Sequence, residues 1–93
     1  MAWKLSAVVE HGPDVLEGVV DDEIVVYSVA SGDSVGLSGT SAWIWRAIGD
    51  GSTVRDLVRR ACEEFDVPRS VCTPDIVGAL ESLRSRGMLR VVG

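Results

Sequence analysis

Hydrophobic and polar residues alternate along the first part of the chain with the two-residue period of a half-buried strand. From Trp3 to Glu10, for example, every second residue is apolar, and later runs are rich in β-branched residues. Turns containing Gly, Pro or Asp separate the runs. The runs cover residues 3–10, 15–20, 23–29 and 34–37, and they predict an antiparallel meander of strands over about residues 3–37.

The last of these strands, Ser34 to Leu37, is the one expected to keep an edge unpaired, since it is short and directly precedes a helix. Ser38 follows it and offers a hydroxyl to the free amides at the start of that helix. Such a junction places a sheet edge beside a helical bundle. The crevice between the two is a natural place for an extended peptide.

The second half of the chain has helical periodicity. A helix over about residues 39–48 carries Ala42, Trp45 and Ile48 on one face, with Trp43 and Ile44 beside them, and ends at the Gly49-Asp50-Gly51 break. A second helix over about 54–65 starts after the capping residue Thr53. Its apolar stripe consists of Val54, Leu57, Val58, Ala61, Cys62 and Phe65.

A third helix is predicted over about residues 74–86, with Thr73 as its cap and Pro74 at its first position, where the missing amide costs nothing. Gly87 ends it. Residues 88–92 form a short extended tail that either pairs with a strand or packs against the helices. The apolar face of this helix consists of Ile76, Val77, Leu80 and Leu83, with Ala79 on its flank.

Composition and charge limit the possible functions. With 93 residues, of which 46% are hydrophobic, the chain supports one domain with a modest core. The formal net charge of -5 disfavours binding to a phosphate backbone. No apolar run approaches the ~20 residues of a membrane span, and the start of the chain lacks the pattern of a signal peptide, so the expected compartment is the cytoplasm.

Residues suited to catalysis or metal binding are sparse. The sole histidine, His11, lies in a Gly-Pro turn with no nucleophile at a motif spacing. Cys62 and Cys72 are expected to be reduced thiols, and with one distant histidine they match no zinc pattern. The glycine-containing segments lack the spacing of a phosphate-binding loop. We therefore expect no catalytic residue, no metal and no cofactor.

Several segments together resemble the PqqD-like proteins, the recognition elements of ribosomally synthesised and post-translationally modified peptides. The resemblance extends from about Glu23 to Leu89, and its most specific residues are Leu37, Trp45 and the closing L-x-x-L-x-x-x-G-M-L. Pro74 departs from the family, whose third helix often begins near Pro68. The matching segments are I-V-V-Y-S-V, V-G-L-S-G-T-S-A-W-I-W, T-V-R-D-L-V and A-L-E-S-L-R-S-R-G-M-L.

The resemblance implies an α+β, winged-helix-like fold in which a three-stranded antiparallel sheet precedes a three-helix bundle. It also implies a non-catalytic protein that binds the leader segment of a precursor peptide by β-strand addition at the last strand and the third helix. The implied peptide-binding residues are Asp33, Ser34, Val35, Gly36, Leu37, Asp75, Ile76, Ala79, Leu80 and Leu83.

The stand-alone length resembles the recognition proteins of lasso-peptide pathways, which present the leader to a leader peptidase and an ATP-dependent cyclase. A peptide chaperone for a radical enzyme in pyrroloquinoline quinone synthesis is the second choice. A winged-helix DNA-binding domain competes with both, although the third helix has nearly balanced charges. An oligomerisation module that pairs its free edge with another copy is a further alternative, whereas the main interpretation expects a monomer.

Overall fold

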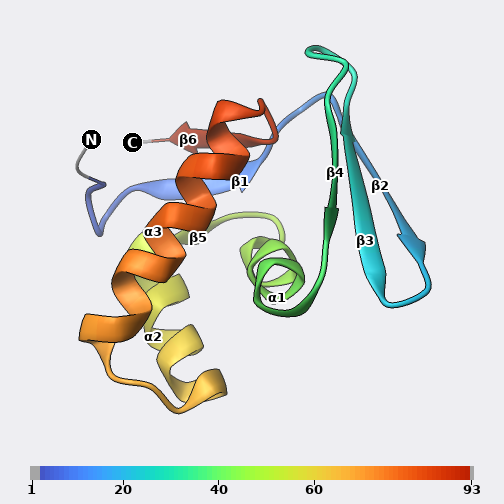
Figure 1. Cartoon of the computed structure of the whole chain (residues 1–93). Coiled ribbons are helices and arrows are strands. Elements are labelled where there is room, and N and C mark those ends of the chain that lie inside the picture. The colour runs from blue at the N-terminus through green and yellow to red at the C-terminus, as the bar shows by residue number, and fades with distance from the viewer. Residues whose placement is uncertain (1–2, 93) are drawn as a thin grey trace.

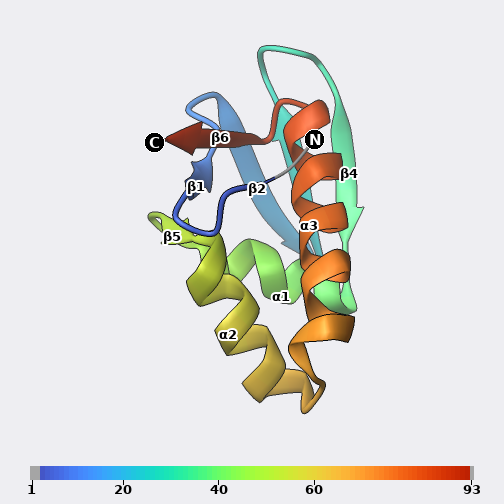
Figure 2. The same ribbon diagram turned by 90° about the vertical axis from the view of Figure 1, so that its left-hand side faces the viewer.

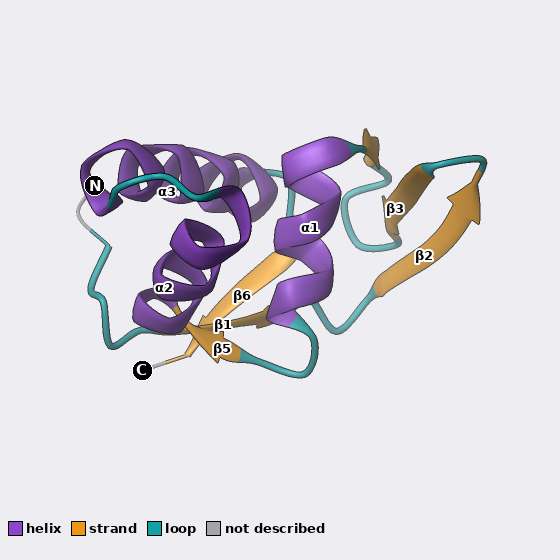
Figure 3. Ribbon diagram, turned by 90° about the horizontal axis from the view of Figure 1, so that it is seen from below, coloured by secondary structure: helices purple, strands orange, loops and turns teal. Residues whose placement is uncertain are grey.

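The computed structural model describes residues 3–92 and contains two small antiparallel sheets and three helices (Figure 1). Helix α1 lies between the helix pair α2 and α3 on one side and the β2–β3–β4 sheet on the other (Figure 3). The elements in chain order are β1 (Val8–His11), β2 (Val15–Val20), β3 (Glu23–Ser28), β4 (Ser34–Leu37), α1 (Gly39–Ile48), β5 (Ser52–Thr53), α2 (Val54–Phe65), α3 (Arg69–Ser85) and β6 (Leu89–Val92).

The strands β2, β3 and β4 form the predicted three-stranded meander, with β3 in the centre. Leu16 pairs with Tyr27 across β2 and β3, and Val26 pairs with Val35 across β3 and β4. Side chains alternate between the two faces, so Ile24 and Val26 are buried beneath the sheet while Tyr27 lies on the outer face. This sheet and the three helices confirm the α+β fold class.

The N-terminal strand does not join the meander, which corrects the predicted order. It begins only at Val8, because residues 3–7 contain a turn in which the Ala7 amide donates to the Lys4 carbonyl at 3.0 Å. Strand β1 pairs instead with β5 and with the C-terminal strand β6. Periodicity predicted an extended tail but did not predict its partner, since β1 and β6 lie at opposite ends of the sequence.

The helices begin at residues with different capping behaviour. Ser38 occupies the N-cap position of α1, but its side chain makes no capping hydrogen bond, contrary to the prediction. Thr53 does cap α2, where its Oγ1 accepts a hydrogen bond from the Asp56 amide at 3.1 Å. The first turn of α1 is therefore held by packing and backbone geometry rather than by a side-chain cap.

The predicted start of α3 at Pro74 is wrong, because the helix begins at Arg69 with Pro68 as its N-cap. Cys72, one turn before Ile76, is buried, and it extends the apolar stripe of α3 towards its N-terminus. Pro74 is an exposed residue inside the helix. It removes one helical hydrogen bond near the start of the helix, and Cys72 and Ile76 on either side of it are buried in the core.

Trp45 is the largest side chain in the core, and it joins α1 to both sheets. It is 1% exposed, and its indole Nε1 donates a hydrogen bond to Glu17 on β2 at 3.2 Å. The His11 ring at the end of β1 stacks on the Trp45 ring with centroids 3.7 Å apart. The core around Trp45 is continuous from β1 through the helices to β6.

Candidate functional site

Strand β4 forms one edge of its sheet, and within residues 3–92 it pairs only with β3. Two backbone hydrogen bonds show which residues of β3 face β4. The Ser28 amide donates to the Asp33 backbone carbonyl at 2.8 Å. The next amide, that of Val29, instead donates to the backbone carbonyl of Asp14, just before β2, at 2.9 Å. Because successive residues of a strand direct their amides to opposite neighbours, even-numbered residues of β3 bond to β4 and odd-numbered ones to β2.

This alternation identifies the backbone groups at the open edge of β4. Val35 and Leu37 lie opposite Val26 and Ile24, so their amides and carbonyls are bonded to β3. Gly36 therefore directs its N–H and C=O away from the sheet. Ser34 has the same orientation, but its amide already donates to the Asp33 Oδ1 at 2.9 Å. Gly36 thus supplies the open amide of β4.

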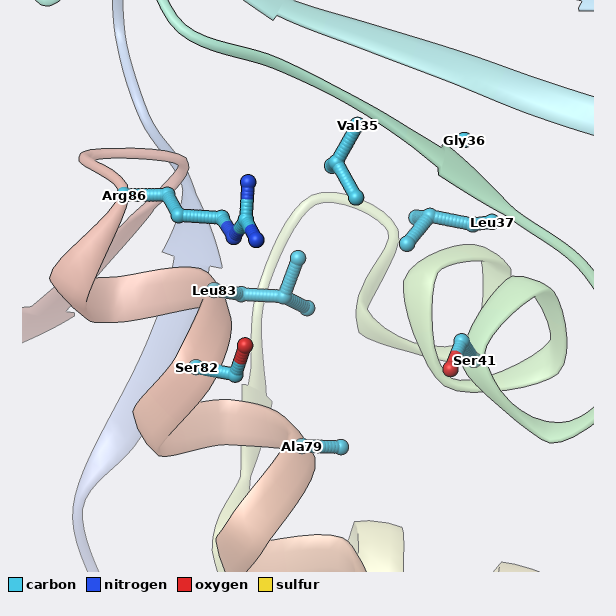
Figure 4. A pocket seen from close by; sticks show the side chains of 8 residues that line it. All are labelled: Val35, Gly36, Leu37, Ser41, Ala79, Ser82, Leu83 and Arg86. Carbon is cyan, nitrogen blue, oxygen red and sulfur yellow. The ribbon is translucent and has the colours of Figure 1, made fainter.

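A groove lies between β4 and α3, which run beside each other (Figure 2). Leu37 and Leu83 are nearly buried and form its apolar floor, with Val35 and Ala79 beside them (Figure 4). Its volume is about 150 Å³, well below the ~300–1,000 Å³ of small-molecule pockets. The groove therefore suits a single side chain. It is lined by Val35, Gly36, Leu37, Ser41, Ala79, Ser82, Leu83 and Arg86.

Arg86 forms one polar end of the groove and was not among the predicted site residues. Its Nη1 lies 3.3 Å from the Asp33 Oδ2, and its carbonyl accepts a hydrogen bond from Ser31 at 3.3 Å. These contacts connect the end of α3 to the loop before β4. No pattern in the sequence links Arg86 to Asp33, because the two residues lie far apart in the chain.

The structure brings seven of the ten predicted site residues to one edge or groove. Leu80 does not reach the groove, because it is fully buried in the core. Asp75 and Ile76 line a second, separate cavity. The residues at the edge or in the groove are Asp33, Ser34, Val35, Gly36, Leu37, Ala79 and Leu83.

The second cavity lies where the start of α1 meets the end of α2 and the start of α3. Its volume is about 170 Å³, and Phe65 and Val71 are 39% and 51% exposed at its rim. Phe65 was predicted to face the core, but its ring instead packs edge-on against Trp43 with centroids 5.3 Å apart. The cavity is lined by Thr40, Ala61, Phe65, Val67, Val71, Cys72, Asp75 and Ile76.

The cysteines are both free thiols, and they lie on α2 and α3. Burial raises the pKa of the Cys72 thiol to about 11. The Cys72 Sγ donates to the Val58 carbonyl at 3.9 Å. A thiol that stays protonated at neutral pH is a poor nucleophile and a poor metal ligand. Within residues 3–92, no group of three or more His, Cys, Asp or Glu residues is arranged to hold a metal ion.

A model of the family described as coenzyme PQQ synthesis protein D (PqqD) matches residues 23–89, which is most of the chain. The chain belongs to the PqqD family. The match includes β3, β4 and all three helices, and therefore both walls of the groove. No curated protein matches the chain. In the part of this PqqD-family chain that the structure describes, no helix is long and apolar enough to cross a lipid bilayer.

Two solved structures share the fold. One is described as TbiB1 in complex with the TbiA(beta) leader peptide, with a TM-score of 0.77 and 24% identity over 87% of this chain and 94% of that chain. The other is described as lasso peptide synthetase B1 complexed with the leader peptide, with a TM-score of 0.70 and 22% identity over 88% of this chain and 96% of that chain. At these identities the similarity establishes the winged-helix-like fold.

Proposed function

We propose that this PqqD-family protein is a non-catalytic recognition protein that binds the leader segment of a ribosomally synthesised precursor peptide. The leader adds as a further strand at the open edge of β4. The observation that carries the proposal is the position of Gly36, whose backbone N–H and C=O face outwards directly beside the groove against α3.

Strand addition at this edge combines two kinds of contact. Backbone hydrogen bonds to Gly36 supply affinity that depends little on the sequence of the peptide. One residue of the bound peptide pairs with Gly36. The peptide residues before and after it direct their side chains to the inner face of the sheet, as Val35 and Leu37 do. One of them enters the groove between Leu37 and Leu83, so the groove selects an apolar side chain.

The two solved structures with this fold support the proposal, because each is described as a complex with a leader peptide. The description of one as a lasso peptide synthetase favours a lasso-peptide pathway. There the bound leader is presented to a leader peptidase and a cyclase in the cytoplasm, where precursors are translated. The family description favours the alternative, a peptide chaperone in pyrroloquinoline quinone synthesis.

The charges on α3 give less support to DNA binding. A recognition helix in the major groove presents free basic side chains, but Arg86 is paired with Asp33 and Arg84 lies over the Trp3 ring, 5.4 Å from its centroid. The net charge of -5 adds a repulsive field. DNA binding would appear as duplex affinity that falls steeply with added salt.

The proposal is tested by titration calorimetry with the synthetic leader peptides of candidate precursors. We expect a dissociation constant that is roughly micromolar or lower, as for a compact interface of about 1,000 Å². Gly36→Pro removes the open amide and should abolish binding. Val19→Pro is the matched control, since Val19 is 71% exposed and its amide faces the opposite edge of the same sheet.

Three outcomes count against the proposal. The first is the absence of binding heat for every leader tested, and the second is full affinity in a folded Gly36→Pro variant. Equal weakening by Val19→Pro is the third, because it would show that the prolines act by disturbing the sheet rather than by blocking a strand.

A further inference from the structure

The outer face of the β4 edge carries a carboxylate directly beside the open backbone groups of Gly36. The Glu23 Oε1 lies 2.5 Å from the position that a Cβ would take at Gly36. Glu23 is the first residue of β3 and is exposed, and like Gly36 it directs its side-chain position to the outer face. The Glu23 carboxylate therefore covers the backbone of Gly36 on the side away from the groove.

The neighbourhood of this carboxylate is acidic. Asp21 and Asp22, in the turn before Glu23, are exposed. Within residues 3–92, no lysine or arginine forms an ion pair with Glu23, whereas Arg86 is already paired with Asp33 on the other side of β4. A peptide strand at this edge consequently meets an uncompensated negative charge on its outer face.

The geometry of strand addition identifies the peptide residue that meets this charge. In either strand orientation, the residue directly opposite Gly36 places its side chain on the same face as the Gly36 hydrogen, which is the outer face. Directly opposite Cβ positions lie about 4.5–5.5 Å apart. Because Gly36 has no side chain, nothing of its own separates that residue from the Glu23 carboxylate. A lysine or arginine at this position reaches the carboxylate.

We propose that Glu23 is a specificity-determining residue that selects a lysine or arginine in the bound peptide at the position opposite Gly36. The inference rests on the proposed strand addition at β4 and adds a charge requirement to it. The groove selects an apolar side chain on one face of the peptide, and Glu23 selects a basic side chain on the other. An aspartate or glutamate at the same position is disfavoured by like-charge repulsion.

The test uses the full chain and a displayed library of randomised peptides, so that no leader needs to be known. Selected peptides should be enriched in lysine or arginine at one position. That enrichment should disappear with Glu23→Gln and change to aspartate or glutamate with Glu23→Lys. Glu64→Lys on α2 makes the same change in net charge at an exposed site far from β4, and it should leave the enrichment unchanged.

A selected peptide then provides a quantitative check. Replacing its basic residue with glutamine should weaken binding to the native chain about twofold to fivefold, the range expected for a cross-strand charge pair. The same replacement should have no effect on binding to the Glu23→Gln variant. Equal effects on both chains would overturn the assignment of Glu23.

The failure of this inference is distinguishable from failure of the proposed function. If selected peptides lose binding with Gly36→Pro but show the same charge preference in every Glu23 variant, strand addition stands and the role of Glu23 is excluded. If no selected peptide depends on Gly36, both proposals are excluded.

Discussion

The Arg86 guanidinium lies 3.3 Å from the Asp33 carboxylate and connects the end of α3 to the start of β4. The other carboxylate oxygen of Asp33 accepts a hydrogen bond from the Ser34 amide. The Asp33 carboxylate thus makes two contacts: it accepts a hydrogen bond from an amide of the β4 edge, and it pairs with an arginine at the end of α3. The pair positions the two walls of the groove at its open end.

Removing this ion pair should affect binding more than stability. The two side chains are 41% and 43% exposed, so Arg86→Ala should cost less than about 1 kcal/mol of unfolding free energy. Leader affinity should fall about threefold to tenfold, because the loop before β4 must then be ordered when the peptide binds. Urea denaturation and calorimetry measure the two effects.

Arg90→Ala is the matched control for Arg86→Ala. Arg90 also pairs with an acidic residue, Glu10 at 3.0 Å, but it does so on the β1–β6 sheet. The Arg90→Ala variant should therefore keep the leader affinity of the native chain. If both variants weakened binding equally, the effect would come from net charge and not from the Asp33 contact.

A charge on the helical wall of the groove should prevent peptide docking without unfolding the protein. Ala79 is partly buried in the groove, so Ala79→Glu forces a carboxylate to lose water when a peptide packs against it. We expect at least a tenfold loss of leader affinity and a nearly unchanged melting temperature. Gly78→Glu adds the same charge one residue earlier, where the surface is open, and should retain binding. Full affinity of a folded Ala79→Glu variant would place the binding site elsewhere.

Trp45 should contribute more to stability than its neighbour Trp43. Trp45→Ala leaves a cavity in the single core and removes the stacking with His11, which together should cost about 3–5 kcal/mol. Trp43→Ala should cost less, because Trp43 is only partly buried and packs edge-on against Phe65. Denaturant unfolding of both variants measures the difference, and equal losses would contradict the assigned core.

The buried thiol of Cys72 should make stability depend on pH in the alkaline range. Burial raises its pKa from 9.0 to about 11, so between these values the unfolded chain loses a proton that the folded chain retains. Unfolding free energy should therefore be unaffected by this group below pH 9 and should fall from pH 9 to 11. The urea midpoint of the native chain should fall between pH 8 and pH 10.5. The fall should be smaller in the Cys72→Ala variant. Equal differences in both chains would exclude Cys72 as the cause.

Local patterns in the sequence predicted β2, β3, β4 and the first two helices, because periodicity and turn residues act over short distances, but they misplaced the start of α3. The apolar alternation of Val35 and Leu37 predicted a strand, and its position before α1 predicted an edge. Pairings between residues far apart in the sequence could not be predicted from these patterns. The partnership of β1 with β6 and the contact between Arg86 and Asp33 both depend on how the whole chain packs.

The sequence predicted which residues of the third helix share one face. It did not show which of them lie in the core and which reach the groove. Ile76, Leu80 and Leu83 share a periodicity, yet Leu80 is enclosed by the core while Leu83 reaches the groove. Which of them reaches the surface depends on the position of β4 relative to α3. Similarly, the identification of Gly36 as the residue with the open amide needed the register of β3 and β4.

The most direct test of strand addition at β4 is the hydrogen-exchange rate of the Gly36 amide, measured by NMR with and without a saturating leader peptide. The proposal predicts that exchange at Gly36 slows on binding, because its open N–H gains a backbone acceptor. Exchange at Val19, whose amide faces the other edge of the sheet, should stay the same. A Gly36 amide that exchanges equally fast in the free and the saturated protein would contradict strand addition at this edge.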